Sequence, residues 1–197
     1  MNILMQVCGI VNLIVLIIFY LAQKKLYLKT EKSFLGMLFI TLLTHGLDIL
    51  SLYAIKERDT LPSSVVESLC KLYLVSLIVI VMSVYSYISQ DVFRKKSEYY
   101  RGTLLYNVLT IIGIEGVMFL PISIFDDGKW VHTYGPATTA TYITVLYGFF
   151  NITFRAIAYR KRINRDRLVA VLIWMGLWSM AASLQFVFKG LLVVSFA

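Results

Sequence analysis

The sequence predicts an all-α, polytopic transmembrane helix bundle with its N-terminus outside the cell. Three observations predict this class: an apolar composition, long apolar segments, and basic residues confined to alternate loops. Of the 197 residues, 59% are hydrophobic and 15% are charged, whereas ordinary globular domains are about 45–50% apolar and about 25% charged. A soluble fold could not cover this much apolar surface, so a membrane is the expected environment.

Six segments have the roughly 20 mostly apolar residues that a helix needs to cross about 30 Å of hydrocarbon. They are residues 2–22, 34–54, 69–92, 104–124, 138–158 and 168–188. No basic residue or cleavage site precedes the first segment, which is expected to be a retained anchor. Residues 191–197 rise only about 10 Å as a helix, so we expect them to open a seventh span. Residues 1–197 are interpreted as one transmembrane sensory domain, cut from a longer protein.

The basic residues follow the loops. Of the 19 Lys and Arg residues, 14 lie in loops 23–33, 93–103 and 155–167. Cytoplasmic loops are enriched in Lys and Arg, so these three loops are expected to be cytoplasmic and the chain to be a multi-pass cell-membrane protein. Topology then accounts for the net charge of +8, and nucleic acid is not an expected partner. Membrane lipids are the expected partners instead.

Ionisable side chains interrupt the apolar segments, where they usually face a bundle interior or a cavity. His45 and Asp48 share one helical face, and Lys71 and Glu115 lie at a similar outer depth. We expect Asp48, Lys71 and Glu115 to meet. Three interpretations remain open: a salt bridge that orders the bundle, a pocket for a polar ligand, and a proton relay.

Neighbouring small and polar residues extend this pattern. Thr41, Thr44 and Ser51 continue the face of Asp48, which predicts that this side of the helix turns away from lipid. Gly113 and Gly116 flank Glu115 and allow a neighbouring helix to approach closely.

The loop DDGKWVHTYGPATTATY, residues 126–142, holds the most varied chemistry of the chain. Trp130, His132 and Tyr134 alternate as in a short extended strand, and Pro136 suits the first turn of the following helix. These aromatic residues either anchor the loop at the membrane interface or cover a pocket at the outer mouth of the bundle. The candidate ligand-binding residues are His45, Asp48, Lys71, Glu115, Trp130, His132, Tyr134, Tyr142 and Gln185.

The sequence contains no catalytic motif such as HExxH, GxSxG or a phosphate-binding glycine loop. Neither an enzymatic activity nor a metal site nor a cofactor is predicted for this chain. Cys8 and Cys70 lack metal-type spacing and are interpreted as inert thiols or as a disulfide pair. Arg155, near the inner end of segment 138–158, is expected to extend to the cytoplasmic surface.

Taken together, the outside N-terminus, Leu47-Asp48-Ile49-Leu50, Tyr134-Gly135-Pro136 with Tyr142, and Gln185 near the end of the sixth segment are a familiar combination. The chain resembles the N-terminal seven-helix sensory regions of bacterial signalling proteins, of the diguanylate cyclase or histidine kinase type. This resemblance implies a ligand-sensing membrane domain whose enzymatic output would lie in a cytoplasmic domain beyond residue 197.

Three functions are therefore expected, in order. The first is a sensor that binds an extracellular or membrane-dissolved small molecule or peptide and rearranges the helices of a homodimer. The second is a small proton-coupled transporter, which needs a polar path through Asp48, Glu115 and Asn151. The third is a structural subunit whose segment 158–167, AYRKRINRDR, recruits an acidic partner or anionic lipid.

Overall fold

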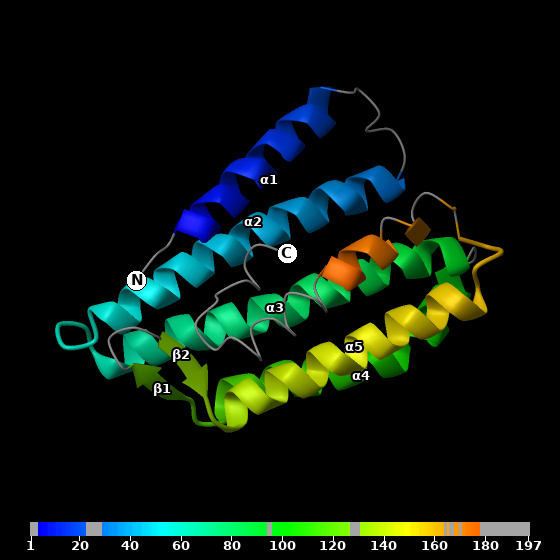
Figure 1. The fold of residues 1–197 in the computed structure, drawn as a ribbon. Coiled ribbons are helices and arrows are strands. Elements are labelled where there is room, and N and C mark those ends of the chain that lie inside the picture. Colours follow the sequence, from blue (N-terminus) through cyan, green and yellow to red (C-terminus); the bar gives the residue numbers. More distant parts are fainter. Residues whose placement is uncertain are drawn as a thin grey trace.

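The computed structural model describes residues 4–22, 29–93, 96–126, 131–163, 165, 168–169 and 171–177. Helices dominate these residues, which confirms the all-α class (Figure 1). The main elements are α1 (Leu4–Ala22), α2 (Lys29–Lys56), α3 (Ser63–Val92), α4 (Lys96–Phe119), β1 (Ser123–Asp126), β2 (Val131–Tyr134) and α5 (Pro136–Ala158). Residues 171–177 are also helical.

Five of the predicted segments correspond to α1 to α5, but only three described helices are long and apolar enough to cross a membrane. These three stretches are Lys32–Lys56, Ser63–Gln90 and Ser97–Phe119. The apolar part of α1 is shorter, and α5 carries more polar residues, among them Asn151 and Arg155. The described residues therefore support three spans, not the six predicted. The sixth predicted segment lies largely outside the described residues, as do residues 191–197.

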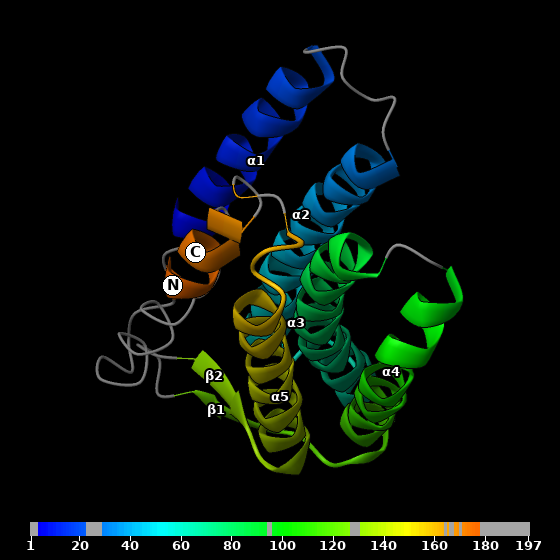
Figure 2. The same cartoon turned by 90° about the vertical axis from the view of Figure 1, so that its right-hand side faces the viewer.

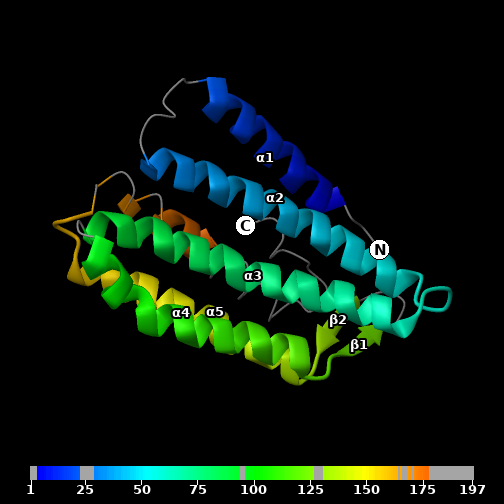
Figure 3. The same ribbon diagram turned by 180° about the vertical axis from the view of Figure 1, so that it is seen from behind.

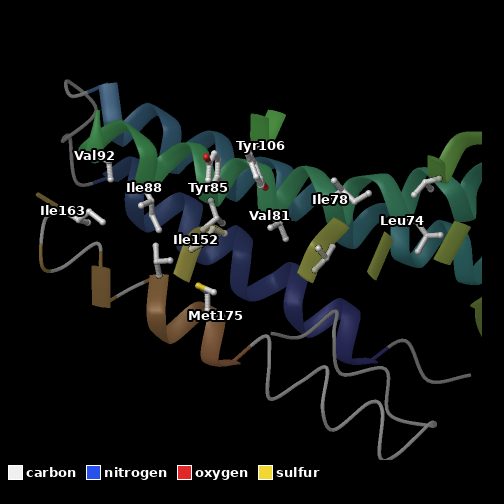
Figure 4. Close-up of a cluster of buried hydrophobic side chains, with 14 residues drawn as sticks. Leu74, Ile78, Val81, Tyr85, Ile88, Val92, Tyr106, Ile152, Ile163 and Met175 are labelled. Atoms are coloured by element: carbon white, nitrogen blue, oxygen red, sulfur yellow. The ribbon is translucent and has the colours of Figure 1, made fainter. Parts of the chain in front are cut away.

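Helix α3 occupies the centre of the bundle. It packs against α2, α4 and α5, while α1 packs against α2 (Figure 2). The main apolar core follows α3 and includes Ile78, Val81 and Ile88, with Ile152 from α5 (Figure 4). Tyr85 of α3 stacks on Tyr106 of α4 with ring centroids 3.6 Å apart. The contacts of α3 explain why its buried residues surround most of its circumference.

The outer faces of the helices are apolar as well. On α5 the large exposed residues recur at helical spacing: Ile143, Leu146, Phe150, Phe154 and Ile157. α4 exposes Leu104, Leu105, Ile111 and Ile112 in the same way. Soluble monomers rarely expose continuous apolar surface of this kind, because water disfavours it. The exposed faces therefore suit lipid.

Successive helices run antiparallel, so the bundle has two distinct ends (Figure 3). The α2–α3 connection at residues 57–62 and the β1–β2 hairpin lie at one end, called here the hairpin end. The end of α3, the start of α4 and the end of α5 lie at the other, called the basic end. Several described basic residues at this end are exposed, among them Arg101, Arg160, Lys161, Arg162 and Arg165.

Glycines allow close helix contacts at two of the crossings with α5. A Cβ at Gly113 of α4 would overlap the Thr144 side chain of α5, and a Cβ at Gly148 of α5 would overlap Val81 of α3. The predicted close approach is confirmed at Gly113. At Gly116 a Cβ would meet Ala140 at an ordinary 3.8 Å, so the flanking glycine is not required there.

Candidate functional site

A buried polar stripe runs along α2 toward the hairpin end. Thr44, Asp48 and Ser51 are all buried, and Asp48 is only 4% exposed. The Thr44 and Ser51 hydroxyls donate to backbone carbonyls of their own helix, at 3.0 Å and 2.8 Å, which satisfies both without a second helix. Asp48 interacts with another group. The predicted one-sided polarity of α2 is confirmed.

His45 belongs to the same region but is already satisfied within α2. Its Nδ1 lies 2.9 Å from the Thr41 carbonyl oxygen, and the side chain is half-buried. This contact holds the ring along its own helix, so its other nitrogen, Nε2, is the atom left for any ligand.

Lys71 of α3 lies at the same level as Asp48. Asp48 is about two turns before the end of α2, and Lys71 is about two turns after the start of α3. The Lys71 ammonium donates to the Met118 carbonyl oxygen at 3.0 Å and pairs with Glu67 at 2.7 Å. Met118 is in the last turn of α4, where carbonyls lack intrahelical partners and the helix dipole favours a cation. Lys71 therefore ties α3 to the end of α4.

We expect Lys71→Met to lower the free energy of unfolding by about 1–3 kcal/mol, because the Met118 carbonyl loses a charged donor. Glu67→Gln is the matched control. The Glu67 side chain is 47% exposed, and exposed ion pairs contribute only about 0–1 kcal/mol. Unfolding in mixed detergent micelles measures both variants. Equal losses would assign the effect to the ion pair and not to the carbonyl contact.

The predicted meeting of Asp48 with Glu115 is wrong. α2 and α4 lie on opposite sides of α3, and Glu115 is exposed on the face of α4 that also carries Ile111 and Phe119 (Figure 2). Position along the apolar segment does not fix the rotation of α4 about its axis, which depends on its contacts with α3 and α5. The buried layer at the hairpin end therefore contains Asp48 and Lys71 without Glu115.

The start of the 126–142 loop forms, together with the residues just before it, a two-stranded antiparallel hairpin of β1 and β2 in which His132 pairs with Phe125. The expected short strand is confirmed as β2. Ile122 and Ile124 pack against the apolar cluster of Ala54, Ile55, Val66 and Cys70 where α2 meets α3. The hairpin thus covers the joint of α2 and α3.

The chain leaves the hairpin through a glycine. Gly135 has a positive φ of 110°, which glycine adopts without strain, and Pro136 follows in the first turn of α5. The Ala137 amide donates to the Pro121 carbonyl oxygen at 3.2 Å. These contacts fix the hairpin to the start of α5.

The other predicted ligand-binding residues are not brought together. Tyr134 and Tyr142 are exposed, so Tyr142 turns away from the core. Trp130 and Gln185 lie outside the described residues, and the structure places only the backbone of His132. Cys8 and Cys70 are free thiols, so the disulfide alternative is wrong. Within the described ranges, no group of His, Cys, Asp and Glu is placed to hold a metal ion.

A second polar cluster lies inside the basic end, where no site was predicted. Arg155 of α5 is only 9% exposed, so the expectation that it extends to the surface is wrong. Its Nη2 donates to the Gly102 carbonyl oxygen of α4, and its guanidinium lies over the rings of Tyr85 and Phe93, at 4.6 Å and 4.9 Å from their centroids. Arg155 therefore connects α5 to α3 and α4.

A sequence signal for this cluster exists but is weak. Tyr85 and Ser89 are four residues apart on α3 and so share a face. Nothing in their spacing shows that this face meets Arg155, because that depends on how α3 and α5 pack.

Comparison with known proteins adds no relative. No family model, no curated protein and no solved structure matches the chain. The class of protein is therefore defined by the fold alone: a helix bundle in which three of the described helices are long and apolar enough to cross a membrane.

Proposed function

We propose that the chain is a membrane-embedded sensory domain. It binds an extracellular or membrane-dissolved ligand at the hairpin end and passes a helix rearrangement to a cytoplasmic output domain. The observation that carries the proposal is the buried polar layer of Asp48, Ser51 and Lys71 beneath a hairpin in an otherwise apolar bundle. Buried ionisable groups in a membrane bundle are costly, and they commonly mark a functional site.

The architecture supplies a route from this layer to the basic end. α3 runs from the level of Lys71 at the hairpin end to Val92 at the basic end, and Phe93, the next residue, contacts Arg155. A ligand that favours one packing of α2 against α3 shifts the equilibrium only by its difference in affinity for the two packings. Such a shift would change the position of the end of α5 relative to α4.

Spin labels test this route without a known ligand. The labels replace exposed Ser97 and Lys161 at the basic end, in a background in which Cys8 and Cys70 are replaced by Ser and Ala. We expect Asp48→Asn to shift the distance distribution by about 1–2 Å, the scale of helix shifts in switching proteins. Glu115→Gln, a neutralisation of an exposed carboxylate on α4, is the control and is expected to change nothing. An unchanged distribution in a folded Asp48→Asn variant would place the sensing site elsewhere.

The proposed orientation has its own test. Asp59→Cys lies in the connection between α2 and α3, Lys161→Cys follows α5, and both positions are exposed. With the hairpin end outside, a membrane-impermeant maleimide is expected to label Asp59→Cys on intact cells. Lys161→Cys should react only after permeabilisation. The reverse pattern would invert the topology and move the ligand site to the cytoplasmic side.

A further inference from the structure

Arg155 presents a buried positive charge without a buried negative one. Among the described residues no carboxylate contacts the guanidinium, and Nη1 has no hydrogen-bond partner. A buried charge is strongly unfavourable unless it is paired and hydrogen-bonded. The stacking on Tyr85 and Phe93 offsets part of this cost. The stacking does not supply a hydrogen-bond acceptor to Nη1, whose N–H groups lie in the plane of the guanidinium.

Two further unsatisfied groups lie beside it. The Tyr85 hydroxyl and the Ser89 hydroxyl are fully buried and make no hydrogen bond of good geometry. The Arg155 guanidinium lies 4.6 Å from the centroid of the Tyr85 ring, and Ser89 follows Tyr85 by one turn on the same face of α3. Ser83 on the same helix bonds its own backbone at 2.8 Å, a contact that Ser89 lacks. Three buried donors therefore gather at one place.

The surroundings hold this arrangement in place. A Cβ at Gly102 would overlap the Phe93 ring, so the glycine allows Phe93 to reach Arg155 while the Gly102 carbonyl accepts from it. Phe93 in turn contacts the ring of Tyr159, with centroids 6.4 Å apart. Arg162 lies over Tyr159 on the outer side. These contacts hold the Arg155 guanidinium in position next to the rings of Phe93 and Tyr159 at the basic end of the bundle.

We propose that Arg155, Tyr85 and Ser89 form a binding site for a phosphate-type oxyanion at the basic end of the bundle. Such an anion accepts several hydrogen bonds at once, and its bonds to a guanidinium are among the strongest in proteins. Exposed Arg160, Lys161 and Arg162 follow α5 directly and add positive charge at the basic end, which attracts anions. Arg155 is within one turn of the end of α5, and a lipid headgroup and free phosphate both carry the oxyanion that it would bind. This site is at the opposite end from the proposed sensing layer and does not depend on it.

Thermal unfolding of the protein in phosphate-free dodecyl maltoside tests the site. One arm adds sodium phosphate against sodium chloride at equal ionic strength. The other adds short-chain phosphatidate against the diacylglycerol of the same chain length. We expect a saturable rise of the unfolding midpoint in at least one arm. A rise with phosphatidate alone identifies a lipid phosphate as the occupant, and a rise in both identifies free phosphate as sufficient.

Arg155→Met removes the charge but keeps much of the side-chain volume. It is expected to raise the ligand concentration that gives half of the stabilisation by about tenfold or more. Lys56→Met, at an exposed position at the hairpin end of α2, is the matched control and should respond like the wild type. If Arg155→Met does not fold, the Tyr85→Phe/Ser89→Ala variant decides, because it keeps the charge and loses two donors. It should also bind more weakly. No rise above chloride and diacylglycerol, or an unchanged response in the variant that folds, would overturn the proposal.

Discussion

Gly148→Leu is expected to lower the free energy of unfolding by about 3 kcal/mol and to separate α5 from α3. Gly148 is buried on α5, and a Cβ there would overlap the Cγ1 atom of Val81 and lie 3.2 Å from the Tyr106 hydroxyl. Val81 is 1% exposed in the main core and cannot move without displacing its neighbours. The larger side chain therefore forces two helices apart. Denaturation by SDS in mixed micelles measures the loss.

A helix-interior glycine without neighbours is the control for this variant. Nothing lies within 4 Å of a Cβ built at Gly46 of α2. Alanine favours helix over glycine by about 1 kcal/mol, so Gly46→Ala is expected to be stabilising. Gly148→Ala is expected to be destabilising. If both alanine variants changed stability in the same direction, the close crossing of α3 and α5 would be contradicted.

Ile152→Ala is expected to cost about 2–5 kcal/mol, because it opens a cavity where α5 packs into the main core. Ile152 is fully buried, at 0% exposure. The matched control on the same helix is Ile143→Ala, whose side chain is 63% exposed. An exposed apolar side chain in a membrane meets lipid in both the packed and the separated helices. Its removal is therefore expected to change stability by less than about 0.5 kcal/mol.

The comparison within α5 also tests the environment of the bundle. SDS denaturation and the thermal unfolding midpoint in detergent should both show a larger loss of stability for Ile152→Ala than for Ile143→Ala. Equal effects at Ile152 and Ile143 would mean that the exposed face of α5 is covered by another protein surface and does not contact lipid.

The transporter alternative places different demands on the described residues. It requires a continuous polar path, but Glu115 is exposed on α4, and the Asn151 amide donates to the Tyr147 carbonyl of its own helix at 2.8 Å. The sensing proposal needs only the layer of Asp48 and Lys71, which is buried.

Much of the local organisation could be predicted without coordinates. The apolar segments predicted α1 to α5, the stripe of Thr44, Asp48 and Ser51 predicted the inner face of α2, and the alternation around His132 predicted β2. These features depend on residues near one another in the chain. The hydrogen bond that the Lys71 ammonium donates to the Met118 carbonyl at the end of α4 could not be predicted, because it joins residues 47 positions apart.

The sequence by itself determined the helical class and the apolar outer surface, which follow from composition and the length of the apolar segments. It also determined the polar face of α2 and the extended strand before α5, which follow from helix and strand periodicity. Only the tertiary structure decided that Glu115 faces outward, that Arg155 is buried between α3 and α4, and that the hairpin covers the α2–α3 joint. The physical reason is that hydropathy gives the depth of a residue and periodicity gives its angle on its own helix. Which helix packs against that side depends on side-chain packing between helices, as at Gly113 and Gly148.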